Sequence, residues 1–140
     1  MNRKLGKYEI FERLGRGGMA EVYRAYHSNL DRYVAIKVLH RFLADDPEFK
    51  SRFEREAQNI ARLKHAHIVH VYDFDFEPED DSYYMVMELV EGYTLKDRLS
   101  DLEKIGEALS LKEALRIIRE SAMALSYAHR AGMIHRDVKP

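Results

Sequence analysis

The sequence contains no cysteine and no tryptophan, and only 3 of its 140 residues are proline. Without cysteine the chain forms no disulfide, and thiol catalysis and cysteine-ligated metal sites are excluded. No run approaches the roughly 18 consecutive apolar residues of a membrane-spanning helix, so we expect no membrane segment in this chain. The N-terminus has no apolar signal-peptide core, which favours a cytoplasmic location. Basic and acidic residues number 23 and 24, and this near balance gives no reason to expect nucleic-acid binding.

A glycine-rich segment near the N-terminus is the first informative feature that is present. It reads Leu14-Gly15-Arg16-Gly17-Gly18-Met19-Ala20-Glu21-Val22. A phosphate can approach a backbone closely where side chains are absent, and glycine reaches positive φ without steric cost. The residues on both sides of the glycines have the pattern of β-strands, which favours a glycine turn between two strands. A dinucleotide-binding fold would need a helix directly after the glycines, and a Walker loop would need Gly-Lys-Ser/Thr. An ordinary hairpin turn remains the alternative.

The next strand-like run, Tyr33 to Leu39, contains Val34-Ala35-Ile36-Lys37. A lysine inside an apolar strand is costly unless its ammonium group meets an anion. This favours a functional role for Lys37, while a lysine on the solvent face of the sheet is the alternative. The choice depends on whether a carboxylate lies within reach.

A helix that follows offers such a carboxylate. Asp46-Pro47 is typical of an N-cap with proline at the first helical position, and the helix is predicted to run to about Lys64. Its apolar residues recur three and four positions apart and form one stripe. Glu56 lies beside this stripe and is the predicted partner of Lys37. Glu54 competes for this role but sits further round the polar side.

The second half of the chain continues with recognisable elements. Residues 71–76 and 83–89 have the pattern of strands, and an apolar helical stripe runs from about Leu111 to Gly132. The chain ends in His135-Arg136-Asp137-Val138-Lys139-Pro140. His65, His67 and His70 have the appearance of a metal cluster, but no cysteine or carboxylate supports them, so a solvated or hydrogen-bonded role is favoured.

In this order and spacing the motifs resemble the protein kinase domain, and they are similar to the eukaryotic-like serine/threonine kinases of bacteria. The resemblance covers about Tyr8 to Pro140, with Ala20 in place of the third glycine of the family pattern. It rests on five segments: Gly15-x-Gly17 with Val22, Val34–Lys37, Phe53–Ala57, Met87–Gly92 and His135–Pro140.

The resemblance implies an α+β, protein-kinase-like fold. Residues 1–91 would form an N-lobe, with a five-stranded antiparallel sheet and the αC helix. Residues 92–140 would begin the helical C-lobe and stop within the catalytic loop. Kinases that resemble this one often carry a transmembrane helix beyond the catalytic domain, so a parent protein anchored through a later segment is compatible with the sequence.

The resemblance also implies a role for each site residue. Lys37 would hold the α- and β-phosphates of ATP, and Glu56 would hold Lys37. Asp137 would accept the proton of a substrate hydroxyl, and Lys139 would counter the γ-phosphate charge. The implied nucleotide-binding residues are Leu14, Gly15, Arg16, Gly17, Gly18, Met19, Ala20, Glu21, Val22, Ala35, Lys37, Met87, Glu88 and Val90.

The expected function is a serine/threonine protein kinase that uses ATP and Mg²⁺ and acts on protein substrates. The family pattern places an Asn and the Asp of a D-F-G triplet, which hold the Mg²⁺, after Pro140. We therefore expect no metal ligand within these residues, and we expect the 140-residue chain to be inactive by itself. The alternative is a non-catalytic, nucleotide-binding or dimerising module, with a dimer through the N-lobe.

Overall fold

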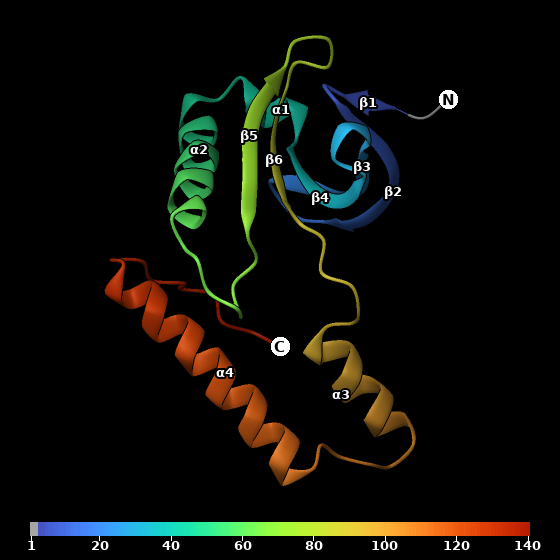
Figure 1. The fold of residues 1–140 in the computed structure, drawn as a ribbon, viewed down its shortest axis with the longest axis vertical. Coiled ribbons are helices and arrows are strands. Elements are labelled where there is room, and N and C mark those ends of the chain that lie inside the picture. The colour runs from blue at the N-terminus through green and yellow to red at the C-terminus, as the bar shows by residue number, and fades with distance from the viewer. Residues whose placement is uncertain (1–2) are drawn as a thin grey trace. The chain divides into compact units, whose positions relative to one another are not determined.

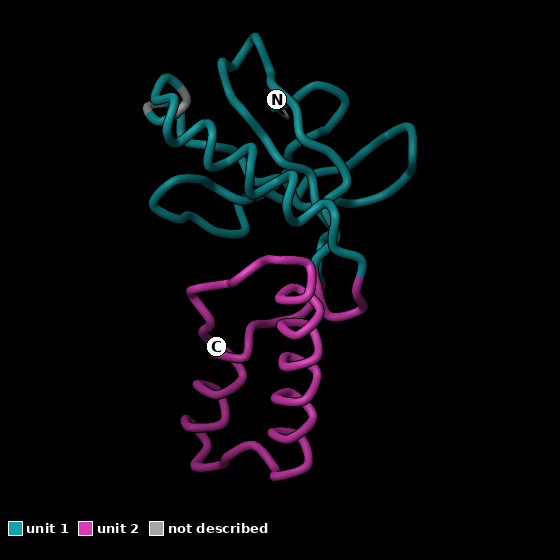
Figure 2. The backbone as a smooth tube through the Cα atoms, turned by 90° about the vertical axis from the view of Figure 1, so that its left-hand side faces the viewer, with its two compact units in different colours: residues 1–64, 69–90 teal, residues 65–68, 91–140 magenta. Residues whose placement is uncertain are grey.

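The computed structural model describes residues 3–140, apart from the side chains of Phe42 and Ala44. The chain forms two compact units, which Figure 2 shows in different colours. Residues 1–64 and 69–90 make up the first unit, and residues 65–68 and 91–140 make up the second. The first unit contains the β-sheet, and the second contains the last two helices of the chain. The fold class is therefore α+β.

The sheet is antiparallel throughout, with the strand order β1-β2-β3-β4-β6-β5 (Figure 1). It has six strands where five were predicted, because Lys4–Leu5 adds a short strand at one edge. The turn residue Gly6 has φ +51°, and Leu5 is fully buried. Two residues are too few to give a periodic signal in the sequence. The strands are β1 (Lys4–Leu5), β2 (Tyr8–Arg16), β3 (Ala20–His27), β4 (Arg32–Leu39), β5 (Val71–Glu77) and β6 (Ser82–Glu88).

Alternation along the strands gives the sheet two apolar faces. Val34, Ile36 and Val38 of β4 belong to one core cluster. Leu39 of the same strand belongs to the other cluster, together with Phe53 of the helix α2 (Pro47–Ala61). Each fully buried side chain of this size stabilises the fold by about 1.5–3 kcal/mol. The sheet and α2 therefore support each other through an apolar core of their own.

Helix α2 (Pro47–Ala61) lies beside β5 (Figure 1). Its start is the predicted one, because Asp46 Oδ1 accepts a hydrogen bond from Glu48 N at 2.9 Å. Its end comes three residues before the predicted Lys64, since the Arg62 N–H bonds back to the last turn. A four-residue helix, α1 (Arg41–Ala44), and a 3₁₀ turn, η1 (Ser28–Leu30), were not predicted because such short elements leave no periodic pattern.

The second unit contains α3 (Leu95–Lys104) and α4 (Leu111–Arg130). Thr94 caps α3 in a reciprocal arrangement with Asp97, and hydrogen bonding from Thr94 lowers the Asp97 pKa. Ser110 caps α4, which ends two residues before the predicted Gly132. Among residues 3–140, every helix is too short or too polar to cross a bilayer.

Candidate functional site

The register of β3, β4 and β6 brings several predicted site residues side by side. Val22 is the cross-strand partner of Lys37, and Lys37 pairs in turn with Met85. One step along, Ala35 pairs with Met87. Since residues two apart on a strand share a face, these positions form one surface of the sheet. Predicted nucleotide contacts that are far apart in the sequence are therefore neighbours in the fold.

Lys37 and Glu56 form an ion pair on this surface. Lys37 Nζ lies 2.7 Å from Glu56 Oε1, and the side chains are 25% and 37% exposed. The ammonium group also lies 5.9 Å from the centre of the Phe53 ring. The pairing predicted for Glu56 over Glu54 is present. A pair this exposed adds at most about 1 kcal/mol to stability, so its value lies in holding the ammonium group in place.

The glycine turn joins β2 to β3 at the edge of the same surface. Gly17 N donates to Ala20 O at 2.8 Å and closes the turn. A Cβ added to Gly15 or Gly18 would meet no other atom within 4 Å. Positive φ was one expected reason for the glycines of this turn. Gly15, Gly17 and Gly18 are not among the described residues with positive φ, so that expectation is wrong. Open space beside the backbone, rather than a left-handed conformation, is what glycine provides here.

Charged side chains flank this turn. Glu21 pairs with Arg13 at 3.3 Å and with Arg16 at 3.4 Å, and it accepts a hydrogen bond from the Tyr23 hydroxyl. That hydrogen bond is the main reason why the Glu21 pKa is below its usual value, and the two arginines lower it further. A lowered pKa keeps Glu21 ionised, and its carboxylate holds the two arginines and Tyr23 together beside the turn. The Leu14 side chain, at the other side of the turn, is about half exposed.

The end of β6 and the residues directly after it carry the predicted hinge. Glu88 N donates to His70 O at 2.8 Å, and the Glu88 carboxylate accepts from His70 N at 3.2 Å. The Glu88 N–H is therefore already bonded within the protein. Met87 is half-buried against the α2 core, whereas Val90 is exposed.

The C-terminal motif lies in the second unit. Asp137 N donates to His135 Nδ1 at 3.2 Å, and Lys139 Nζ lies 3.1 Å from Asp137 Oδ2. Both charged side chains are about three-quarters exposed. Arg136 has φ 65°, in the left-handed region that costs a non-glycine residue roughly 1–2 kcal/mol. Such strain is typical of backbone at functional sites, and no pattern in the sequence predicted it.

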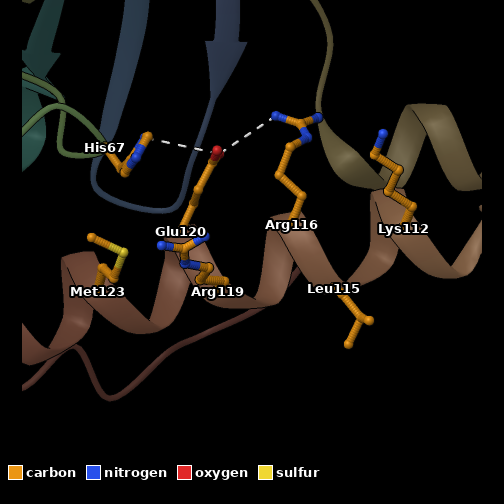
Figure 3. Close-up of a pocket in the computed structure, with 7 residues that line it drawn as sticks. All are labelled: His67, Lys112, Leu115, Arg116, Arg119, Glu120 and Met123. Carbon is orange, nitrogen blue, oxygen red and sulfur yellow. Dashed lines mark ion pairs between the residues drawn. The ribbon is translucent and has the colours of Figure 1, made fainter.

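A separate pocket lies on α4 (Figure 3). Glu120 points between Arg116, at 3.5 Å, and His67, at 4.0 Å. This pocket contains none of the predicted nucleotide-binding residues. The His65 and Tyr127 rings lie 5.2 Å apart in a tilted contact. Within residues 3–140 no group of three or more histidine and carboxylate side chains could hold a metal ion.

Sequence reasoning missed one residue beside the glycine turn. His40, directly after β4, has its Nε2 atom 3.0 Å from Gly17 O. His40 belongs to none of the motifs that carry the resemblance, so the sequence did not single it out. The register alone could have suggested it, because Leu39 pairs with Ala20 and the next position faces the turn.

Comparisons with known proteins agree on one family. Residues 8–140 match the family described as the protein kinase domain. Over 137 residues the chain is 47% identical to a probable serine/threonine-protein kinase, SCO3848, of Streptomyces coelicolor. It is 47% identical over 135 residues to the serine/threonine-protein kinase PrkC of Bacillus subtilis. Each alignment covers 96% of this chain and 20% of the relative, so the chain spans about a fifth of their length.

Solved structures give the same result. The crystal structure of the PknI kinase domain of Mycobacterium tuberculosis matches with a TM-score of 0.81 and 34% sequence identity. The match covers 99% of this chain and 54% of that chain. The resemblance found in the motifs therefore extends to the whole described backbone.

Proposed function

This chain belongs to the protein kinase domain family, and we propose that it forms the ATP-binding part of a serine/threonine protein kinase. The reaction is transfer of the ATP γ-phosphate to serine and threonine hydroxyl groups of proteins. Kinases of this family generally use ATP and Mg²⁺. The names of the relatives support the hydroxyl specificity, and the Lys37–Glu56 ion pair at 2.7 Å carries the argument for catalysis.

The residues around the glycine turn fit the phosphates of ATP. The N–H groups of Gly18 and Met19 donate to no protein acceptor within the described part of the chain. Free backbone N–H groups in a glycine turn are suited to phosphate oxygens. The open space beside Gly15 and Gly18 allows close approach. This supports the turn from Leu14 to Val22 as the phosphate-covering segment.

The adenine site is proposed on the same face of the sheet. Val22, Ala35 and Met87 provide apolar surface, and the register sets them on neighbouring strands. The Glu88 carbonyl and the Val90 backbone would bond the adenine edge. Bound ATP supplies the phosphoryl group, and bound Mg²⁺ neutralises part of its charge.

The chemical roles follow from charge and position. Lys37 holds the α- and β-phosphates, and Glu56 keeps its ammonium group in place. Asp137 orients the substrate hydroxyl and accepts its proton, and Lys139 counters the γ-phosphate charge. The family pattern places the Mg²⁺ ligands after the position of Pro140. A polypeptide of these 140 residues alone is therefore expected to be inactive.

Phosphoamino-acid analysis tests the proposal. The chain is continued from Pro140 through the rest of a kinase domain and is incubated with Mg-ATP and a basic protein that contains Ser, Thr and Tyr. We expect phosphoserine and phosphothreonine and no phosphotyrosine, with incorporation lost in Asp137→Asn. Phosphotyrosine as the main product, or an Asp137→Asn variant with the wild-type rate, would contradict the proposal.

A further inference from the structure

His40 is tied to the glycine turn by two hydrogen bonds. Its backbone N–H donates to Met19 O at 2.9 Å, and its Nε2 lies 3.0 Å from Gly17 O. The first bond extends the β3–β4 pairing by one step, because Leu39 is the partner of Ala20. The second reaches across the turn to the Gly17 carbonyl.

The chemistry of this contact fixes the direction of the bond. A carbonyl oxygen only accepts hydrogen bonds, so the His40 ring donates from Nε2. Gly17 N meanwhile donates to Ala20 O at 2.8 Å. Both backbone groups of Gly17 are therefore held by the protein, which restrains the turn at its base.

The same bonds leave the tip of the turn available. The Gly18 and Met19 N–H groups have no protein acceptor in the described part of the chain. Met19 packs partly against the core cluster that contains Ala20, Leu39 and Phe53. The turn is thus anchored on one side by the His40 side chain, directly after β4, while two N–H donors stay free for an anion.

From this geometry we infer that His40 is a positioning residue for the glycine turn, holding Gly17 so that the turn stays over the phosphates of ATP. The inference rests on the proposed function. The role assigned to His40 is indirect, because it acts through the Gly17 carbonyl. Its effect belongs to the phosphate part of the nucleotide, since the adenine surface is built by Val22, Ala35 and Met87.

The test compares ATP with adenosine, which lacks phosphates, in the chain continued through the rest of a kinase domain. His40→Ala should raise the dissociation constant of ATP about threefold to tenfold, as expected for one lost hydrogen bond. The dissociation constant of adenosine should not change. His40→Gln, whose amide N–H can donate from a similar position, should recover most of the ATP affinity. Arg41→Ala, at the neighbouring exposed position, is the matched control and should behave as wild type.

Each other outcome has a distinct meaning. An unchanged ATP affinity in His40→Ala would overturn the inference. Equal weakening of ATP and adenosine would overturn it as well, because His40 would then support the sheet in general. A wild-type protein that fails to bind ATP would reject the proposed function itself, independently of His40.

Discussion

Glu56 and Glu54 lie two residues apart on α2, and their surroundings differ. Glu56 pairs with Lys37 at 2.7 Å, whereas Glu54 makes no ion pair within residues 3–140. The difference arises because Glu56 lies on the side of α2 that faces Lys37. The sequence pattern favoured Glu56 for this reason, and the pairing is confirmed.

We predict that Glu56→Gln lowers kcat/KM for Mg-ATP about 10- to 100-fold in the chain continued through the rest of a kinase domain. Glutamine keeps an oxygen that can accept from Lys37 but removes the negative charge, so the ammonium group is held less firmly at the phosphates. Glu54→Gln is the matched control, with the same chemical change on the same helix. Equal rates for the two variants in steady-state assays would contradict the assigned role of Glu56.

Other features of single residues could not be predicted from the sequence. The loop glycines were expected partly for positive φ, but positive φ occurs instead at Gly6, Gly92, Gly106 and Gly132, in other turns. The His40–Gly17 contact depends on a side chain that reaches across the turn. Arg136 adopts its left-handed backbone through its surroundings rather than through its own preference. Such facts come from three-dimensional context, which one sequence does not encode locally.

At the scale of elements, strong periodic patterns were predictable and short elements were not. The strands follow from alternation, the start of α2 follows from the cap at Asp46, and the start of α4 follows from the apolar stripe that begins at about Leu111. β1, α1 and η1 contain two to four residues each and leave no periodic signal. Helix ends were placed two or three residues too late, because final turns depend on local backbone bonding.

Helix α4 has an unusual exposure for an amphipathic helix. Leu111, Leu115 and Ile118 are 75%, 56% and 64% exposed, although they belong to its apolar stripe. Burial of each would be worth about 1.5–3 kcal/mol. The helix therefore lacks much of the packing that most helices need for stability. The strands of the first unit, in contrast, have buried side chains on both faces.

For the 140-residue chain we predict that amides of Leu115–Leu125 exchange much faster than those of Val34–Val38. The central strand β4 opens only with its core, whereas α4 can open locally. Hydrogen exchange followed by mass spectrometry measures both segments in one sample. The sample must be a verified monomer, because association through α4 would protect it. Equal protection of the two segments in such a monomer would contradict this prediction.

At the scale of the whole molecule, two compact units divide the predicted site residues. The glycine turn, Lys37, Glu56 and the hinge belong to the first unit, and Asp137 and Lys139 belong to the second. The sequence predicted the family from motifs spread over both units, and the comparisons confirm it. The proposed chemistry needs charges from both units. Removing one charge in the first unit therefore tests the account as a whole.

The most direct test is the rate of phosphate transfer in a Lys37→Met variant of the chain continued through the rest of a kinase domain. Methionine keeps the apolar stem and removes the ammonium group that is proposed to hold the phosphates. We expect kcat to fall roughly 10²–10³-fold or more. Lys50→Met, which removes a lysine of α2 that lies over the Tyr83 ring, should keep the wild-type rate. A Lys37→Met variant as fast as Lys50→Met would contradict the central claim.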